Sequence, residues 1–153
     1  MALKVILENA SKFSLQERSS RIVKLFIDAL TAKGEKMAVM ATQLMGPTYE
    51  KLLGVIMRKE EHCMAFWRAV VELSQSRNEA ILNNLVYNLP GILSLAAPMH
   101  RVDPLCDIYA ELFYSPIANK LTLASYYHIM AQLFPSKADN LKELLYWMMN
   151  ELL

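Results

Sequence analysis

The chain has 153 residues, of which 54% are hydrophobic and 20% charged, and its formal net charge is +1. This length suffices for one domain over residues 1–153 with its own core, and the apolar surplus excludes intrinsic disorder. Residues 1–77 hold 12 Lys and Arg against 8 Asp and Glu, whereas residues 78–153 hold 4 against 7. The two halves could meet different partners or stack head to tail, but neither reaches the charge density of a dedicated nucleic-acid-binding domain.

The helices predicted in chain order come from the 3.6-residue period of the apolar side chains, and no segment alternates like a strand. They span 2–10, 15–33, 35–45, 48–58, 60–75, 78–89, 91–97, 104–114, 116–134 and 137–152. A single helix over 47–76 is the alternative to the break between 58 and 60. Because most connections are short, successive helices should pack antiparallel. The sequence therefore predicts an all-α fold, either a multi-helix antiparallel bundle or a short helical-repeat solenoid.

The helix over 15–33 has the clearest boundaries. Ser14 followed by Glu17 is typical of a capping box, and Gly34 stands where a left-handed C-terminal cap belongs. Later boundaries are marked by proline. Gly46-Pro47 predicts the end of one helix and the start of the next, and Ser115-Pro116 predicts a helix start.

The stretch 80–100 is long enough to cross a bilayer and holds no charged residue if His100 is neutral. Three asparagines and a central Pro90-Gly91 would be costly in lipid and would break a helix. We therefore predict a buried pair of helices with a tight turn at Pro90 and no membrane span. Residues 83–98, NNLVYNLPGILSLAAP, resemble armadillo or HEAT repeats, in which apolar helices carry Asn and small residues at tight turns. This resemblance implies a helical-repeat fold but no function.

The most reactive-looking stretch is 58–69, RKEEHCMAFWRA. A helical metal site needs ligands three or four residues apart, whereas Glu60, Glu61, His62 and Cys63 are consecutive and diverge around a helix. We interpret Arg58 to Glu61 as a solvated helix end, with Cys63 and the aromatic residues after it turned inward.

The other histidines are weaker candidates for chemistry. His100 with Asp103, Cys106 and Asp107 could form a metal cluster, although Asp103 is better explained as a helix cap. His128 is interpreted as a partly buried core residue. No nucleotide-binding or hydrolase motif is present, so we predict neither an enzyme, a cofactor nor a metal site.

The last helix carries six consecutive apolar residues, 144–149, which cover its whole circumference. The stripe predicted to face the core is Leu141, Leu145, Met148 and Leu152. The predicted partner-binding set consists of apolar and aromatic residues outside this stripe: Tyr146, Trp147, Met149 and Leu153. A second candidate surface, for an acidic peptide or phosphates, is the basic strip Lys12, Arg18, Arg21 and Lys24.

These patterns favour a non-enzymatic protein–protein interaction domain, a scaffold or adaptor that could also self-associate. One alternative is a nucleic-acid-associated protein that uses the basic half. The other is a small helical enzyme or ligand-binding bundle with His100, Cys106 or His128 at work. Because Cys63 and Cys106 follow no paired spacing and no signal peptide opens the chain, we expect an intracellular protein, cytoplasmic or nuclear, with free thiols. A disulfide between the two cysteines is the alternative.

Overall fold

The computed structural model describes residues 2–96 and 103–152, with side chains except at 103–107 and 152. Every regular element in these two ranges is a helix, so the all-α prediction is confirmed. The elements are α1 (Ala2–Glu8), η1 (Ala10–Lys12), α2 (Leu15–Glu17), the π-helical turn η2 (Arg18–Ile22), α3 (Val23–Leu30), α4 (Glu35–Gln43), α5 (Met45–Ile56), α6 (Glu60–Ser74), α7 (Glu79–Ala96), α8 (Asp103–Leu112), α9 (Lys120–Ser125), α10 (Tyr127–Leu133), η3 (Pro135–Lys137) and α11 (Ala138–Leu152).

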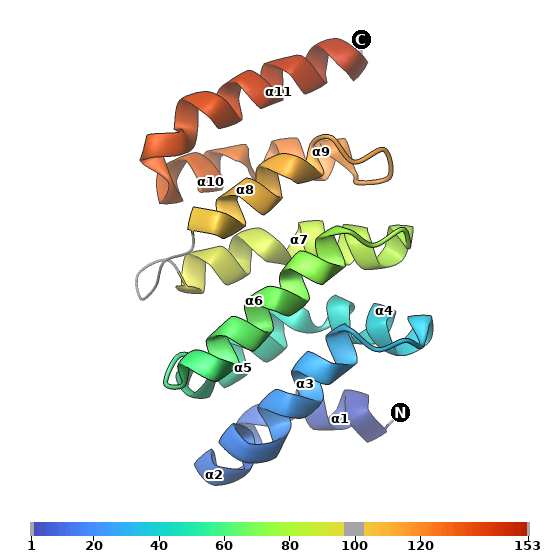
Figure 1. Cartoon of the computed structure of the whole chain (residues 1–153), viewed down its shortest axis with the longest axis vertical. Coiled ribbons are helices and arrows are strands. Elements are labelled where there is room, and N and C mark those ends of the chain that lie inside the picture. Colours follow the sequence, from blue (N-terminus) through green and yellow to red (C-terminus); the bar gives the residue numbers. More distant parts are fainter. Residues whose placement is uncertain (1, 97–102, 153) are drawn as a thin grey trace.

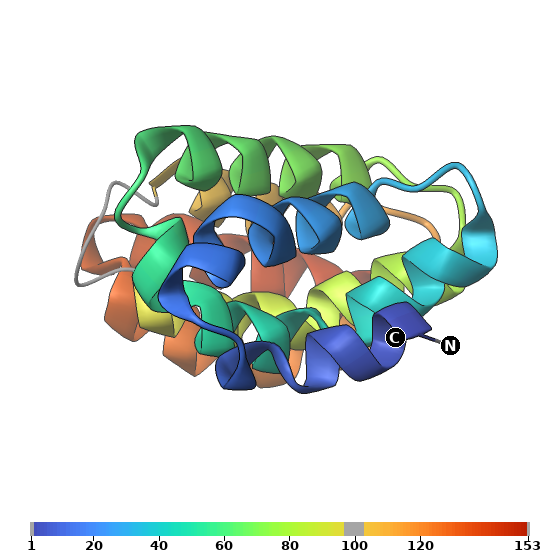
Figure 2. The ribbon, with the colours of Figure 1, turned by 90° about the horizontal axis from the view of Figure 1, so that it is seen from below.

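The helices lie in two rows along the long axis of the molecule (Figure 1). One row holds α3, α6 and α8, and the other holds α1, α4 with α5, α7, and α9 with α10; the view along the axis separates the same two rows (Figure 2). Helices contact both their neighbours in the row and the helices opposite, as α7 does with α5, α6 and α8. The first helices, α1 to α3, therefore form one end of the molecule, and α11 forms the other.

The start of the α2–α3 segment follows the predicted capping box. The Ser14 Oγ accepts the Glu17 N–H at 3.2 Å, and the Glu17 carboxylate accepts the Ser14 N–H at 3.1 Å. The prediction for the other end is wrong, because α3 stops at Leu30, and a turn follows in which the Ala32 N–H donates to the Ala29 carbonyl at 3.4 Å. Gly34 has φ −77° and ψ 114°, so it is extended and precedes α4 rather than closing α3 in a left-handed conformation.

The region predicted as two helices with a turn at Pro90 is a single helix, α7. A proline inside a helix forfeits one backbone hydrogen bond and costs about 3 kcal/mol. The helix persists because its apolar side chains are buried on both sides of that position, among them Leu85, Val86, Leu89, Ile92 and Leu93. Burial of each such side chain contributes about 1.5–3 kcal/mol, which outweighs the local loss.

The asparagine side chains of α7 form hydrogen bonds with backbone groups of neighbouring elements. The helix α4 ends at Gln43 and α5 begins at Met45, and this break frees a carbonyl and an N–H. The Asn88 amide nitrogen donates to the Thr42 carbonyl at 3.1 Å, while its Oδ1 accepts the Gly46 N–H at 3.2 Å. Asn84 donates to the Val39 carbonyl at 3.2 Å. These bonds fix the α4–α5 corner onto α7.

Two further predicted boundaries have a clear outcome. The break between α5 and α6 is real, so the alternative of one helix over 47–76 is wrong. The helix predicted over 116–134 is also wrong, because α9 begins at Lys120 and the chain breaks again at Tyr126. Asn119 sets the new start, since its Oδ1 accepts the Thr122 N–H at 3.1 Å and its own N–H is held by Asn83 at 2.9 Å.

The hydrophobic core runs through the described part of the chain from Leu7 to Met148. Within it, the ring of Phe66 packs against those of Phe26 and Tyr49, with centroid distances of 5.9 Å and 4.7 Å respectively. Among the described residues, no helix is long and apolar enough to span a bilayer.

Candidate interaction site

A groove of about 500 Å³ lies between α8 and α11. Its lining consists of Ala110, Tyr114, Lys137, Asn140, Leu141, Glu143, Leu144 and Trp147. The rings of Tyr114 and Trp147 face each other at a centroid distance of 5.1 Å and an angle of 40°. The site is therefore an aromatic and aliphatic groove that also carries one cationic, one anionic and one amide side chain.

The groove exists because α11 packs chiefly against α10 and η3 rather than against α8. Leu141 and Met148 are each 2% exposed and anchor α11 in the core. Trp147 is next to Met148 in sequence, so it projects about 100° away around the helix and reaches Tyr114. Both rings stay accessible, with exposed fractions of 43% for Trp147 and 62% for Tyr114.

The short segment that carries Tyr114 is held by one lysine. The Lys120 ammonium donates to the carbonyls of Leu112, Phe113 and Ser115, which close the end of α8. A cation at a helix C-terminus also interacts favourably with the helix dipole. Burial lowers the pKa of Lys120 below its ordinary value, because desolvation disfavours the charged form. The aromatic wall of the groove is thus fixed from behind.

The predicted partner-binding residues fall into two sets. Trp147 lines the groove, whereas Tyr146 and Met149 are exposed elsewhere on α11, and Leu153 lies outside the described residues. The Lys142 ammonium lies 5.8 Å from the centre of the Tyr146 ring. Of the predicted core stripe, Leu141 and Met148 are buried, Leu145 is only half-buried, and the side chain of Leu152 lies outside the description.

The residues that sequence reasoning missed are on the other wall of the groove. Tyr114 and Ala110 come from α8 and the turn after it, about thirty residues before α11 in the chain. Helical periodicity identifies the exposed side of each helix, but it does not say that α8 and α11 face each other. An exposed aromatic residue at the end of an amphipathic helix was the one available signal.

The basic strip is less continuous than predicted. Lys12 and Arg21 are exposed, but Arg18 is half-buried and its Nε has no hydrogen-bond partner in the structure. The Lys24 ammonium lies 2.5 Å from the carboxylate of Asp28, so part of its charge is neutralised. These residues share one end of the molecule but do not form a closed anion site.

The reactive-looking stretch 58–69 begins with exposed residues, as Arg58, Glu60 and Glu61 show. Phe66 is fully buried, whereas His62 and Cys63 are half-buried on diverging sides of α6. The Nδ1 of His62 has no hydrogen-bond partner in the structure. In residues 2–96 and 108–151, no three His, Cys, Asp or Glu side chains gather as a metal site would require.

The remaining candidates for chemistry have separate outcomes. His128 is exposed, so the prediction of a partly buried core histidine is wrong; α10 turns Met130 into the core, and His128, two residues earlier, lies on the other side of the helix. His100 and the side chains of Asp103, Cys106 and Asp107 lie outside the described residues, and the predicted cluster stays a prediction.

A second groove of about 500 Å³ lies beside the Asn88 network, between α5, α7 and α10. Exposed Tyr87, half-buried Tyr126 and Ile129 line it together with Gly91, and Glu50 is its one charged side chain. Its rings form no contact like that of Tyr114 with Trp147. Comparison of the chain with protein-family models, with curated proteins and with solved structures found no match.

Proposed function

We propose that the chain is a non-enzymatic helical protein-interaction domain, a scaffold or adaptor, which binds an apolar segment of another protein in the groove between α8 and α11. The observation that carries this proposal is the half-exposed pair of Tyr114 and Trp147 over an aliphatic floor. Tryptophan and tyrosine are over-represented among the residues that dominate binding energy at protein interfaces.

The contact between the two rings favours binding for an energetic reason. A side chain that becomes ordered only on association costs about 0.5–1.5 kcal/mol. Trp147 already packs against Tyr114, and Tyr114 is held from behind by Lys120, so part of that cost is met in the free protein. The apolar area still exposed on both rings is then available to stabilise a complex at about 25 cal/mol per Å².

The polar residues of the groove match this role. Lys137, Asn140 and Glu143 lie one helical turn apart along η3 and α11. Polar groups around an apolar centre add specificity and exclude water from the contact beneath them. A helical-repeat arrangement, which the two rows of helices support, would place this groove near one end of the molecule.

The two alternative functions have less support. The basic strip that would bind nucleic acid is interrupted by the Lys24–Asp28 ion pair and by the half-buried Arg18. For an enzyme or ligand-binding bundle, the described side chains offer no convergent set of nucleophile, base and orienting group. Neither alternative uses the Tyr114–Trp147 groove.

The proposal is tested by quantitative affinity capture from cell lysate with matched variants. Trp147→Ala and Tyr114→Ala should lose the same captured proteins, at least about tenfold, because each removes one wall of the groove. Val71→Ala is the control, since Val71 is also 43% exposed but lies on α6. Thermal unfolding of all variants should stay close to that of the wild type. If both groove variants retain every protein that the wild type and Val71→Ala capture, the groove is not the binding site.

A further inference from the structure

The two ends of the molecule expose apolar side chains beside charges of opposite sign. We define the head surface as Val5, Lys12, Leu15, Arg18 and Arg21, which belong to the α1–η2 end. The tail surface is Asp139, Glu143, Tyr146 and Met149 on α11. The two surfaces lie at opposite ends of the long axis (Figure 1).

The head surface has two exposed aliphatic residues. Val5 is 58% exposed and points away from the buried Leu7, while Leu15 is 48% exposed at the start of α2. The elements that carry them lie nearest the viewer when the molecule is seen along its axis from this end (Figure 2). The same end carries the cations of Lys12, Arg18 and Arg21.

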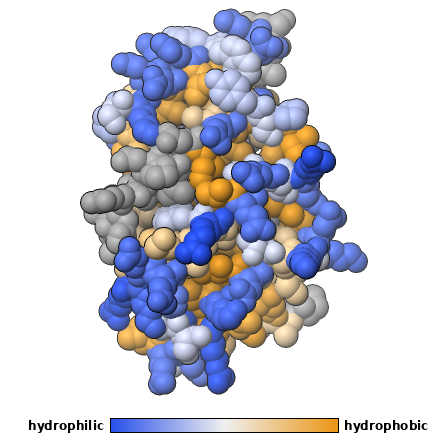
Figure 3. Space-filling view, in the orientation of Figure 1, coloured by the Kyte–Doolittle hydropathy of each residue, from blue (hydrophilic) through white to orange (hydrophobic). Residues whose placement is uncertain are grey.

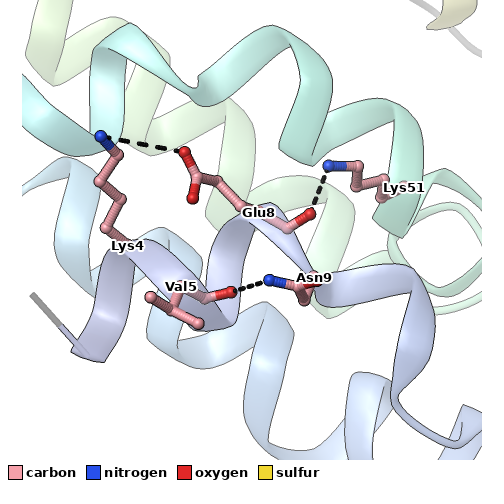
Figure 4. A network of polar contacts seen from close by, with 5 residues as sticks. All are labelled: Lys4, Val5, Glu8, Asn9 and Lys51. Atoms are coloured by element: carbon pink, nitrogen blue, oxygen red, sulfur yellow. Dashed lines mark hydrogen bonds and ion pairs between the residues drawn. The ribbon is translucent and has the colours of Figure 1, made fainter.

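The acidic groups near the head surface are already engaged. The Glu8 carboxylate lies 3.9 Å from the Lys4 ammonium, and the Lys51 ammonium donates to the Glu8 carbonyl at 2.6 Å, which holds α1 on α5 (Figure 4). Glu17 accepts hydrogen bonds from Ser14 in the capping box. Within the described part of the chain, neither Lys12 nor Arg21 forms an ion pair, so the head surface remains basic.

The tail surface has the opposite net charge, because its two carboxylates outnumber the Lys142 ammonium that lies over the Tyr146 ring. Tyr146 is 57% exposed on the face of α11 that points away from the buried Leu141, and Met149 is 47% exposed on the flank beside it. Asp139 and Glu143 are exposed on that same face, because residues 139, 143 and 146 recur with helical spacing. Neither carboxylate forms an ion pair with any described residue.

The position of these surfaces argues for a second copy of the chain as the occupant. In stacked helical proteins, each layer buries its apolar face against the next, and the outer face of a terminal layer is normally polar. Here both terminal layers expose apolar side chains. Opposite charges favour contact between a head and a tail, whereas two heads or two tails would bring like charges together. On the side that carries α3, α6 and α8, hydrophilic residues lie between separate hydrophobic patches (Figure 3).

We propose that the tail surface of one molecule binds the head surface of a second copy, so that the helical rows continue from one molecule into the next. Such a contact is heterologous, because the two patches differ, and it does not close upon itself unless the rotation allows a ring. Its apolar residues, Tyr146 and Met149, do not line the Tyr114–Trp147 groove, and Glu143 is the one residue that both surfaces share. Variants of the apolar residues therefore test the two proposals separately.

Sedimentation velocity of the purified chain over a concentration series tests this contact. The wild type should form a ladder of dimers and longer species that shortens as salt rises, since screening weakens surface charge attraction. A tail variant, Tyr146→Ser with Met149→Ser, and a head variant, Val5→Ser with Leu15→Ser, should each be monomeric alone. An equimolar mixture of the two variants should stop at a dimer, because one intact head and one intact tail remain. Trp147→Ala should leave the ladder unchanged.

Three results would overturn the head-to-tail contact. The first is a wild type that stays monomeric up to about 1 mM at low salt, a concentration at which even a weak contact of about −4 kcal/mol is half-formed. The second is a mixture of folded head and tail variants that contains no dimer. The third is a tail variant that is monomeric while the head variant assembles like the wild type, which would indicate a tail-to-tail contact. Arg21→Glu supplies a variant with its apolar residues intact, and it should weaken assembly at least about tenfold.

Discussion

At the scale of single residues, polar side chains close gaps in the backbone of this apolar chain. Ser14 caps the α2–α3 segment, Lys120 satisfies the carbonyls at the end of α8, and Asn88 serves both sides of the α4–α5 break. A buried donor or acceptor left without a partner costs about 1–3 kcal/mol. This cost applies most directly at Asn88, which is buried.

The capping box gives the first prediction. Ser14→Ala should lower the free energy of unfolding by about 0.5–2 kcal/mol, because it removes the acceptor of the Glu17 N–H. Ser20→Ala is the control, since the Ser20 hydroxyl is exposed and only donates to the carbonyl of Gln16. Chemical denaturation should show a change within about 0.5 kcal/mol for that control. Equal midpoints for the two variants would contradict the role of Ser14.

The buried phenol of Tyr49 gives a prediction at alkaline pH. Burial, with the nearby Cys63 thiol as a smaller cause, raises the pKa of Tyr49 above its ordinary value of 10.0. The unfolded chain therefore loses this proton near pH 10 while the folded chain keeps it, so folding stability is present below pH 10 and falls as pH rises further. Tyr49→Phe should make that fall shallower.

At pH 7, Tyr49→Phe should leave the free energy of unfolding nearly unchanged. The only hydrogen bond of the Tyr49 hydroxyl that the structure records is to the Met57 sulfur at 3.7 Å, and sulfur is a weak acceptor. Urea denaturation at pH 7 and between pH 9 and 11 tests both statements. Parallel pH profiles for the wild type and Tyr49→Phe would show that Tyr49 ionises normally in the folded protein.

At the scale of helices, two glycines of α5 should respond in opposite ways to alanine. A Cβ at Gly46 would collide with the Asn88 Oδ1, so Gly46→Ala should destabilise the protein and disturb the α4–α5 corner. A Cβ at Gly54 would meet no atom within 4 Å, so Gly54→Ala should stabilise the helix by about 0.5–1 kcal/mol. Thermal unfolding midpoints should move down and up respectively. A rise for Gly46→Ala would show that Asn88 can move away without loss.

The helices also show how far the sequence alone could go. The apolar period predicted the all-α class, and Ser14 with Glu17 predicted the capping box, because both depend on residues close together in the chain. The break before α6 was predicted with one long helix as its alternative. The sequence reasoning failed at Pro90, where burial on both sides outweighs the proline penalty, and at Asn119, whose N–H is held by Asn83 from another helix. Trp147 was predicted as a binding residue, but its partner Tyr114 was not, because only the packed fold brings α8 and α11 face to face.

At the scale of the whole molecule, α7 is the helix with contacts on most sides. It packs against α4, α5, α6, α8, α9 and α10, whereas α11 is held chiefly by α10 and η3. Local unfolding costs least where few buried contacts are lost. Backbone amides of α7 should therefore exchange with deuterium most slowly, and those of α1 and α11 should exchange earlier. Hydrogen exchange measured by mass spectrometry would contradict this order if α11 were as protected as α7.

The close approach of Gly46 to Asn88 also restricts how this protein can evolve. Residue 46 cannot gain a side chain while an asparagine fills the space above it, and residue 88 cannot lose its amide while the backbone at 42 and 46 depends on it. A change at either position alone should be removed by selection, whereas paired changes that exchange volume and hydrogen bonds could persist. Among descendants of this sequence we therefore expect positions 46 and 88, 42 residues apart, to vary together or not at all.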